Sequence, residues 1–106
     1  MDKKYKGSKT IGGLYMDEKL QGLKIQVEKV IKLLEDRLKN DPNRPILKTL
    51  YNRYVRAEEI LSNGEEIEKI MIKGGCRAYL DAFSDYMNPL LSEMYKAEKI
   101  LSELIR

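Results

Sequence analysis

The sequence predicts a small all-α protein, an antiparallel four-helix bundle made of two helical hairpins. Apolar residues recur in steps of three and four along most of the chain. Turn sequences (Asn-Asp-Pro, Ser-Asn-Gly and Asn-Pro) interrupt this pattern at intervals of about 20 residues, as expected for helices joined by short connections. No segment shows the strict alternation of apolar and polar residues between turn pairs that marks strands, so we expect no sheet.

The first predicted helix spans residues 17–39. Its apolar stripe is carried by Leu20, Leu23, Val27, Val30 and Leu34. Asp17 suits the N-cap because its carboxylate accepts a hydrogen bond from an otherwise unpaired backbone amide. The helix should end before Pro42, since proline disfavours a helical residue in front of it. Residues 1–13 are rich in lysine and glycine, and we interpret them as a flexible basic arm on a single helical domain, residues 14–106.

The second predicted helix has Pro45 in its first turn and ends near Gly64, which suits the left-handed residue that closes many helices. Its stripe is carried by Leu47, Leu50, Tyr54, Ala57 and Leu61. The third helical stretch, residues 67–86, is interrupted by Gly74 and Gly75. Each glycine inside a helix costs roughly 1 kcal/mol relative to alanine. We therefore expect a third helix that is bent or broken at this pair, and we favour a continuous, bent helix.

The fourth predicted helix begins at Pro89, after Asn88 as its N-cap. Its stripe is carried by Leu90, Met94, Ala97, Leu101 and Leu104. The short connection before it makes the last two helices antiparallel neighbours. Residues 57–62 (AEEILS) and 97–102 (AEKILS) differ at one position, and each segment follows a proline-led start. This match suggests two related hairpins, although short runs of such common helix-forming residues also arise by chance.

Composition restricts the class further. At 106 residues the chain is expected to form one domain, and with 42% hydrophobic residues it is too apolar for a disordered protein. Residues 1–9 hold four lysines and one aspartate, so they account for the whole formal net charge of +3. The folded part is thus neutral, and the basic balance is weak evidence for nucleic acid. A single cysteine, with no signal peptide or membrane-spanning apolar run, favours the cytoplasm and no membrane contact.

The residue inventory argues against catalysis. The chain has no histidine, which is the commonest general base and metal ligand. It has no glycine-rich phosphate loop, and one cysteine excludes a zinc site made of thiolates. We expect Cys76 to be a buried, inert thiol. Pairs of carboxylates such as Glu65 and Glu68 share a helix face that could hold Mg²⁺, but solvated charge is the preferred interpretation. No enzyme activity, metal or cofactor is expected.

The remaining residues favour a protein that acts by binding another protein, as a small regulator, inhibitor or assembly factor. Tyrosine and methionine bury contact area readily and are enriched at interfaces. We predict a partner-binding patch in the third helical stretch, formed by Tyr79, Phe83, Tyr86 and Met87. The expected partner is an unidentified protein or a second copy of this chain. A second copy is included because the apolar stripes of the first and last helices are wide enough to leave apolar surface on an isolated monomer.

The alternative function is nucleic-acid binding. The basic residues Arg44, Lys48, Arg53 and Arg56 carry all the charge at the start of the second helix, interleaved with tyrosines. Arginine and aromatic groups suit phosphates and stacked bases, so this helix and the lysine arm form a candidate site for phosphate or an acidic partner. The same basic face would also be explained by ion pairs with acids on a neighbouring helix.

Overall fold

The computed structural model describes residues 11–83 and 87–105 of the protein. These residues form four α-helices and one 3-10 turn: α1 Ile11–Asn40, α2 Pro45–Asn63, η2 Ile67–Lys69, α3 Gly75–Phe83 and α4 Pro89–Leu104. There is no β-strand within these two ranges. The all-α class predicted from the sequence is confirmed.

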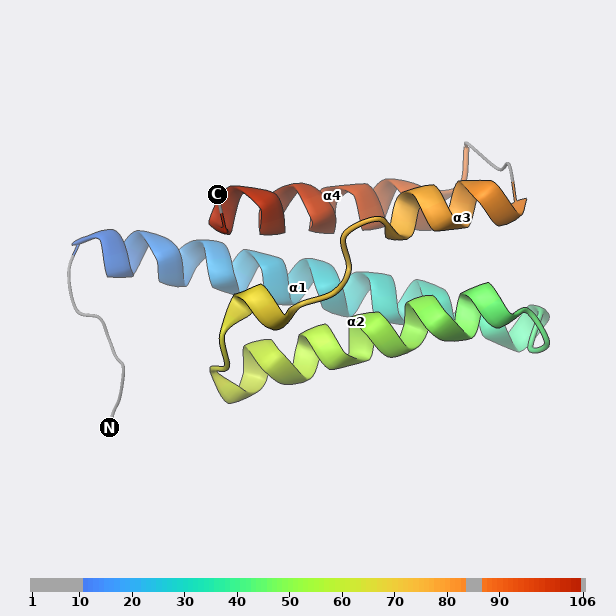
Figure 1. Ribbon diagram of the computed structural model, residues 1–106, viewed down its shortest axis with the longest axis horizontal. Coiled ribbons are helices and arrows are strands. Elements are labelled where there is room, and N and C mark those ends of the chain that lie inside the picture. The colour runs from blue at the N-terminus through green and yellow to red at the C-terminus, as the bar shows by residue number, and fades with distance from the viewer. Residues whose placement is uncertain (1–10, 84–86, 106) are drawn as a thin grey trace.

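The helices form an up-down-up-down bundle (Figure 1). The long helix α1 contacts α2 on one side and α4 on the other, and α3 contacts the same two helices. The bundle is 44 Å long, which agrees with the length of about 45 Å that 30 helical residues give at 1.5 Å each. The predicted two-hairpin arrangement is therefore correct, with α1 as its longest member.

The core lies along the axis of the bundle and receives side chains from every α-helix. Its fully or almost fully buried apolar residues are Leu23, Val27, Val30 and Leu34 of α1, Leu47, Leu50, Tyr54, Ala57 and Ile60 of α2, Ile70 and Ile72, Tyr79 of α3, and Leu90, Met94, Ala97 and Leu101 of α4. The predicted stripes account for most of them. Near the end of α2, however, the fully buried residue is Ile60, whereas Leu61 is only partly covered.

The start of α1 differs from the prediction. This helix begins at Ile11, within the segment interpreted as a flexible arm, and Asp17 lies inside the helix instead of capping it. The predicted start overestimated the effect of Gly12 and Gly13. Extending an existing helix gains a hydrogen bond for each added residue without a new nucleation cost, so a pair of glycines does not necessarily end it.

The predicted C-terminus of α2 and the predicted N-terminus of α4 are confirmed. Gly64 adopts a left-handed conformation with φ of 70°, and its amide donates to the carbonyl of Ile60. Asn88 caps α4, because its side-chain Oδ1 accepts a hydrogen bond of 2.7 Å from the amide of Leu90. These two residues could be predicted to end or begin a helix from the sequence alone, because each one satisfies backbone groups that helix termini leave unpaired.

The preferred prediction of a continuous third helix is wrong, and the broken alternative is correct. After η2 the chain runs through residues 70–74, the crossing segment, before α3 begins at Gly75 (Figure 1). Side chains of this segment alternate: Ile70 and Ile72 are buried, whereas Met71 is 69% exposed. This alternation is a property of extended backbone and places two apolar side chains in the core without a helix.

The two glycines have different reasons for ending the helix. Gly74 has a φ of 87°, a conformation that costs other L-residues about 1–2 kcal/mol. Gly75 is buried against α2, and a Cβ atom there would come within 3.2 Å of Cδ2 of Leu50. The pair therefore combines a reversed backbone with close packing, which a bent helix would not provide.

Candidate interaction groove

The break in the third element leaves part of α4 without a helical neighbour. The helix α3 has only 9 residues and runs beside the N-terminal part of the 16-residue α4 (Figure 1). Beyond this point the crossing segment turns away toward η2, so no helix of the described chain continues the line of α3. A hollow forms between the C-terminal part of α4 and the crossing segment.

We call this hollow the α4 groove. It has a volume of about 530 Å³ and is lined mainly by carbon atoms of Lys73, Tyr95, Glu98, Lys99, Leu101, Ser102 and Ile105. The Tyr95 ring is 62% exposed and Ile105 is 41% exposed, so two large apolar side chains face water here. Tyr95 also borders a second hollow of about 270 Å³, the α3–α4 cleft, with Cys76, Leu80, Leu91 and Ser92.

Glu98 joins the groove to the start of α3. One carboxylate oxygen accepts a hydrogen bond of 3.1 Å from the amide of Gly74, and the other accepts one of 2.9 Å from the amide of Cys76. A carboxylate at a helix N-terminus satisfies unpaired amides and interacts favourably with the helix dipole. Glu98 on α4 therefore caps α3 from across the bundle and holds the end of the crossing segment in place.

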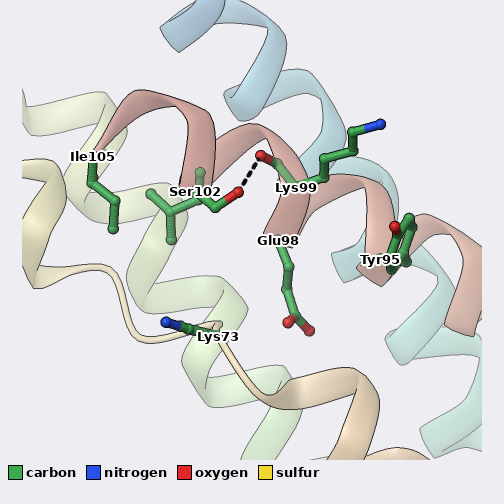
Figure 2. Close-up of a pocket in the computed structure, with 7 residues that line it drawn as sticks. Lys73, Tyr95, Glu98, Lys99, Ser102 and Ile105 are labelled. Carbon is green, nitrogen blue, oxygen red and sulfur yellow. Dashed lines mark hydrogen bonds between the residues drawn. The ribbon is translucent and has the colours of Figure 1, made fainter.

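Two lysines lie on opposite sides of the groove. Figure 2 shows the Lys73 and Lys99 side chains extending in opposite directions, with Glu98 between them. Neither ammonium group makes an ion pair within the described part of the chain, whereas Lys69 and Lys96 are paired with Glu65 and Glu93. The charge of Glu98 is directed at backbone amides, so the rim that faces solvent is positive.

Cys76 and Tyr54 lie near the Glu98 carboxylate. Burial raises the pKa of the Cys76 thiol to about 12, and the Glu98 carboxylate adds to the rise, so the thiol is protonated at neutral pH. Burial, with a smaller effect of the Glu98 charge, also raises the pKa of Tyr54. The buried hydroxyl of Tyr54 has no hydrogen-bond partner among the described residues. These groups support packing and show no activated nucleophile.

The structure does not assemble the predicted partner-binding patch on one surface. Tyr79 is fully buried, so the expectation that its ring faces a partner is not met. Phe83 stacks beside it at 4.7 Å between ring centroids and is only partly covered, and Met87 is 92% exposed. Tyr86 lies outside the described residues. Tyrosine is amphipathic, and from spacing alone its ring could belong to either the core or the surface.

Phe83 instead belongs to a cluster that includes a residue of the predicted basic set. The guanidinium carbon of Arg44 lies 4.6 Å from the Phe83 ring centroid, and that of Arg37 lies 5.0 Å from it. Arg37 also donates a hydrogen bond to the buried hydroxyl of Tyr79. Cation–π contacts of this kind stabilise the end of the bundle. Sequence spacing did not indicate Arg37, because its side chain on α1 reaches Tyr79 of α3, a residue 42 positions away in the sequence.

The predicted basic set does not form one face either. Arg44 pairs with Asp41 at 3.1 Å, and Arg56 pairs with Glu59 and Glu65. Lys48 and Arg53 are exposed and make no ion pair in the described ranges. Because they are five residues apart, they point about 140° away from each other around α2. Half of the set is thus engaged in ion pairs, and the other half is divided between two directions.

Sequence reasoning did not indicate Lys73, Tyr95, Glu98 or Lys99 as site residues. The sequence did not reveal the extended segment, because Ile70, Met71 and Ile72 are consecutive apolar residues and a short apolar run is compatible with both a strand and a buried helix. Only their burial in the folded protein shows the alternation. Within residues 11–83 and 87–105, no group of three or more acidic, cysteine or histidine side chains is placed to hold a metal ion. None of the described helices is both long and apolar enough to span a bilayer.

Fold and site together define a small helical-bundle protein with an apolar, lysine-rimmed groove along α4. Residues 17–106 match the family described as YeeD uncharacterised protein, and the chain belongs to that family.

One relative, Uncharacterized protein YeeD of Bacillus subtilis strain 168, is 42% identical over 67 residues. The matched region covers 56% of this chain and 66% of the relative, which is just under two thirds of the relative's length. No solved structure matches the chain significantly.

Proposed function

We propose that the protein acts by binding another protein through the α4 groove, as a small regulator, inhibitor or assembly factor without catalysis of its own. The observation that supports this most is the Tyr95 ring, which is 62% exposed where the α4 groove and the α3–α4 cleft meet. An exposed aromatic ring between two hollows is the kind of residue that anchors protein interfaces. The single cysteine, protonated in this fold, suits the reducing cytoplasm as the proposed compartment.

The test is affinity capture from the source organism with the wild-type chain and three variants. Tyr95→Asp places a charge in the proposed interface, Met87→Asp tests the patch predicted from the sequence, and Ile25→Asp is a matched control on α1. Ile25 is 50% exposed and lies outside the α4 groove and the α3–α4 cleft. We expect Tyr95→Asp to lose a protein that the other two variants retain, with helicity by circular dichroism unchanged. Retention of that protein by Tyr95→Asp, or the absence of a specific partner, would contradict the proposal.

The alternative is nucleic-acid binding through the basic second helix and the N-terminal lysine arm, and within that helix Lys48 and Arg53 are exposed and unpaired in the described residues. Binding to phosphates weakens steeply as salt rises, because released counterions contribute most of the free energy. A salt titration with DNA and RNA, followed by Lys48→Glu combined with Arg53→Glu, separates the two functions. Unchanged binding in this double variant rules out the second helix as a nucleic-acid site.

A further inference from the structure

The outer side of α4 carries a second helical stripe besides the one in the core. Leu90, Met94, Ala97 and Leu101 face the core, whereas Tyr95, Lys99, Ser102 and Ile105 line the groove. The groove residues are separated by three or four positions and therefore form a row along the helix. Rows of this kind accept the ridges of another helix, with axes 8–10 Å apart in ordinary helix packing. The shape of this surface suits a helix better than an extended strand.

The position of the groove supports the same geometry. It continues the line of α3 along α4, at the place where a full-length third helix would have packed (Figure 1). The crossing segment closes the core there with Ile70 and Ile72 but leaves Tyr95 and Ile105 uncovered. From Tyr95 to Ile105, the groove residues at its two ends, the chain rises about 15 Å, which corresponds to about 10 residues of a partner helix.

Charge selects the kind of helix. Lys73 and Lys99 lie on the two sides of the groove without acidic partners in the described chain (Figure 2). The one carboxylate in the groove, Glu98, is already hydrogen-bonded to two backbone amides. A second copy of this chain docking symmetrically would bring four lysines together, which is unfavourable. A partner with acidic residues beside an apolar stripe would complement both rims.

On the basis of the proposed function, we infer that the α4 groove accepts an amphipathic helix whose apolar stripe covers Tyr95 and Ile105 and whose acidic residues face Lys73 and Lys99. This mode of recognition lays one helix into an apolar groove, with contacts repeating every three or four residues. The acidic residues would supply orientation and selectivity, and the apolar stripe would supply most of the affinity.

The inference is tested with two synthetic helical peptides of about 14 residues that span the groove and share one leucine stripe. One peptide has glutamates beside the stripe and the other has lysines, and both carry the same neutral fluorophore for anisotropy measurements. We expect the glutamate peptide to bind the wild-type chain about tenfold more tightly than the lysine peptide, since two exposed ion pairs are gained. Tyr95→Ala should weaken the binding of both peptides.

The charge contribution is isolated by Lys73→Glu combined with Lys99→Glu, which should remove or reverse the preference for the glutamate peptide. Lys48→Glu combined with Arg53→Glu makes the same change in net charge on α2 and should alter the preference by less than about twofold. Equal binding of the two peptides to the wild-type chain, or an unchanged preference in the groove variant, would overturn the inference.

The outcomes also separate this inference from the proposed function. If neither peptide binds while Tyr95→Asp still loses a captured protein, the helical occupant is wrong and the proposed function stands. If sedimentation shows a dimer that Tyr95→Asp dissociates, a second copy occupies the groove and the acidic helix is again excluded. If neither peptide binds and no protein is captured, both proposals fail.

Discussion

The two hairpins of this bundle close the core in different ways. In the first, α1 and α2 are continuous helices of 30 and 19 residues. In the second, α3 has 9 residues, and part of its place is taken by the crossing segment, which contributes Ile70 and Ile72 to the core. An extended segment covers the core with few residues but does not cover the outer side of the neighbouring helix. The groove along α4 is therefore a consequence of how the second hairpin is shortened.

The near-identical segments 57–62 and 97–102 show how different the environments of the two hairpins are. Ala57 and Ala97 are both fully buried, but the next buried residue is Ile60 in α2 and Leu101 in α4. The buried positions thus differ by one residue, which is about 100° around a helix. Similar sequence therefore gave similar helices without equivalent packing, and the match is not evidence that the hairpins have the same structure.

The largest expected effect concerns the crossing segment. Ile72→Ala removes a fully buried side chain, and we expect it to lower the free energy of unfolding by about 2–5 kcal/mol. The matched change Met71→Ala, at the adjacent exposed position, should alter it by less than about 0.5 kcal/mol. Urea denaturation of both variants measures the difference. Similar losses in both would mean that this segment does not alternate between core and solvent.

The next effect tests the shifted packing of the similar segments. In α2 we expect Ile60→Ala to lower the free energy of unfolding more than Leu61→Ala does. In α4 we expect the opposite order, with Leu101→Ala lowering it more than Ile100→Ala does. Truncating a fully buried aliphatic residue costs about 2–5 kcal/mol, and partly covered residues cost less. Thermal denaturation of the four variants is sufficient. The same order in both helices would show that the two segments pack equivalently after all.

Glu98 and Glu58 occupy corresponding positions of the two segments but have different partners. Glu98 accepts hydrogen bonds from the amides of Gly74 and Cys76, whereas Glu58 accepts one from the hydroxyl of Ser62 on the surface. We expect Glu98→Ala to cost about 1–3 kcal/mol, because two amides lose a charged partner, and Glu58→Ala about 0.5 kcal/mol or less. Hydrogen exchange should show faster exchange of the Cys76 amide in Glu98→Ala alone. Equal stability of the two variants would show that Glu98 does not stabilise the start of α3 as a cap.

The glycines of the two hairpins should respond in opposite directions. Gly22→Ala lies inside α1 with no atom near the added Cβ, so we expect stabilisation by about 0.5–1 kcal/mol. Gly74→Ala also has space, but its φ of 87° makes the change unfavourable by about 1 kcal/mol or more. Denaturant midpoints measure both effects. Stabilisation by Gly74→Ala would show that the left-handed turn is not required.

The smallest effect is a pH dependence from the second hairpin. Folding raises the pKa of Cys76 from 9.0 to about 12, because burial disfavours the thiolate. The corresponding stability is fully present below about pH 9 and is lost as pH rises toward 12. Denaturation at about pH 8 and about pH 10 should show a smaller loss in Cys76→Ala than in the wild-type chain. An identical loss of stability in both proteins would mean that other groups, including Tyr54, cause the destabilisation at high pH.

The sequence by itself determined the elements that depend on neighbouring residues. The apolar period predicted most of the core of α1, α2 and α4, and the roles of Gly64 and Asn88 followed from local backbone chemistry. Helix periodicity and capping involve groups only a few residues apart, and such interactions can be recognised in a single sequence.

Only the tertiary structure decided the rest. It placed Tyr79 in the core, brought Arg37 to the hydroxyl of Tyr79, and brought Glu98 to the start of α3. Each of these depends on groups that are distant in sequence and on which side of a helix its neighbour covers. The groove has the same origin: whether Tyr95 is covered depends on the path of residues 70–74, which buries Ile70 and Ile72 and ends where Gly75 packs closely against Leu50 of α2.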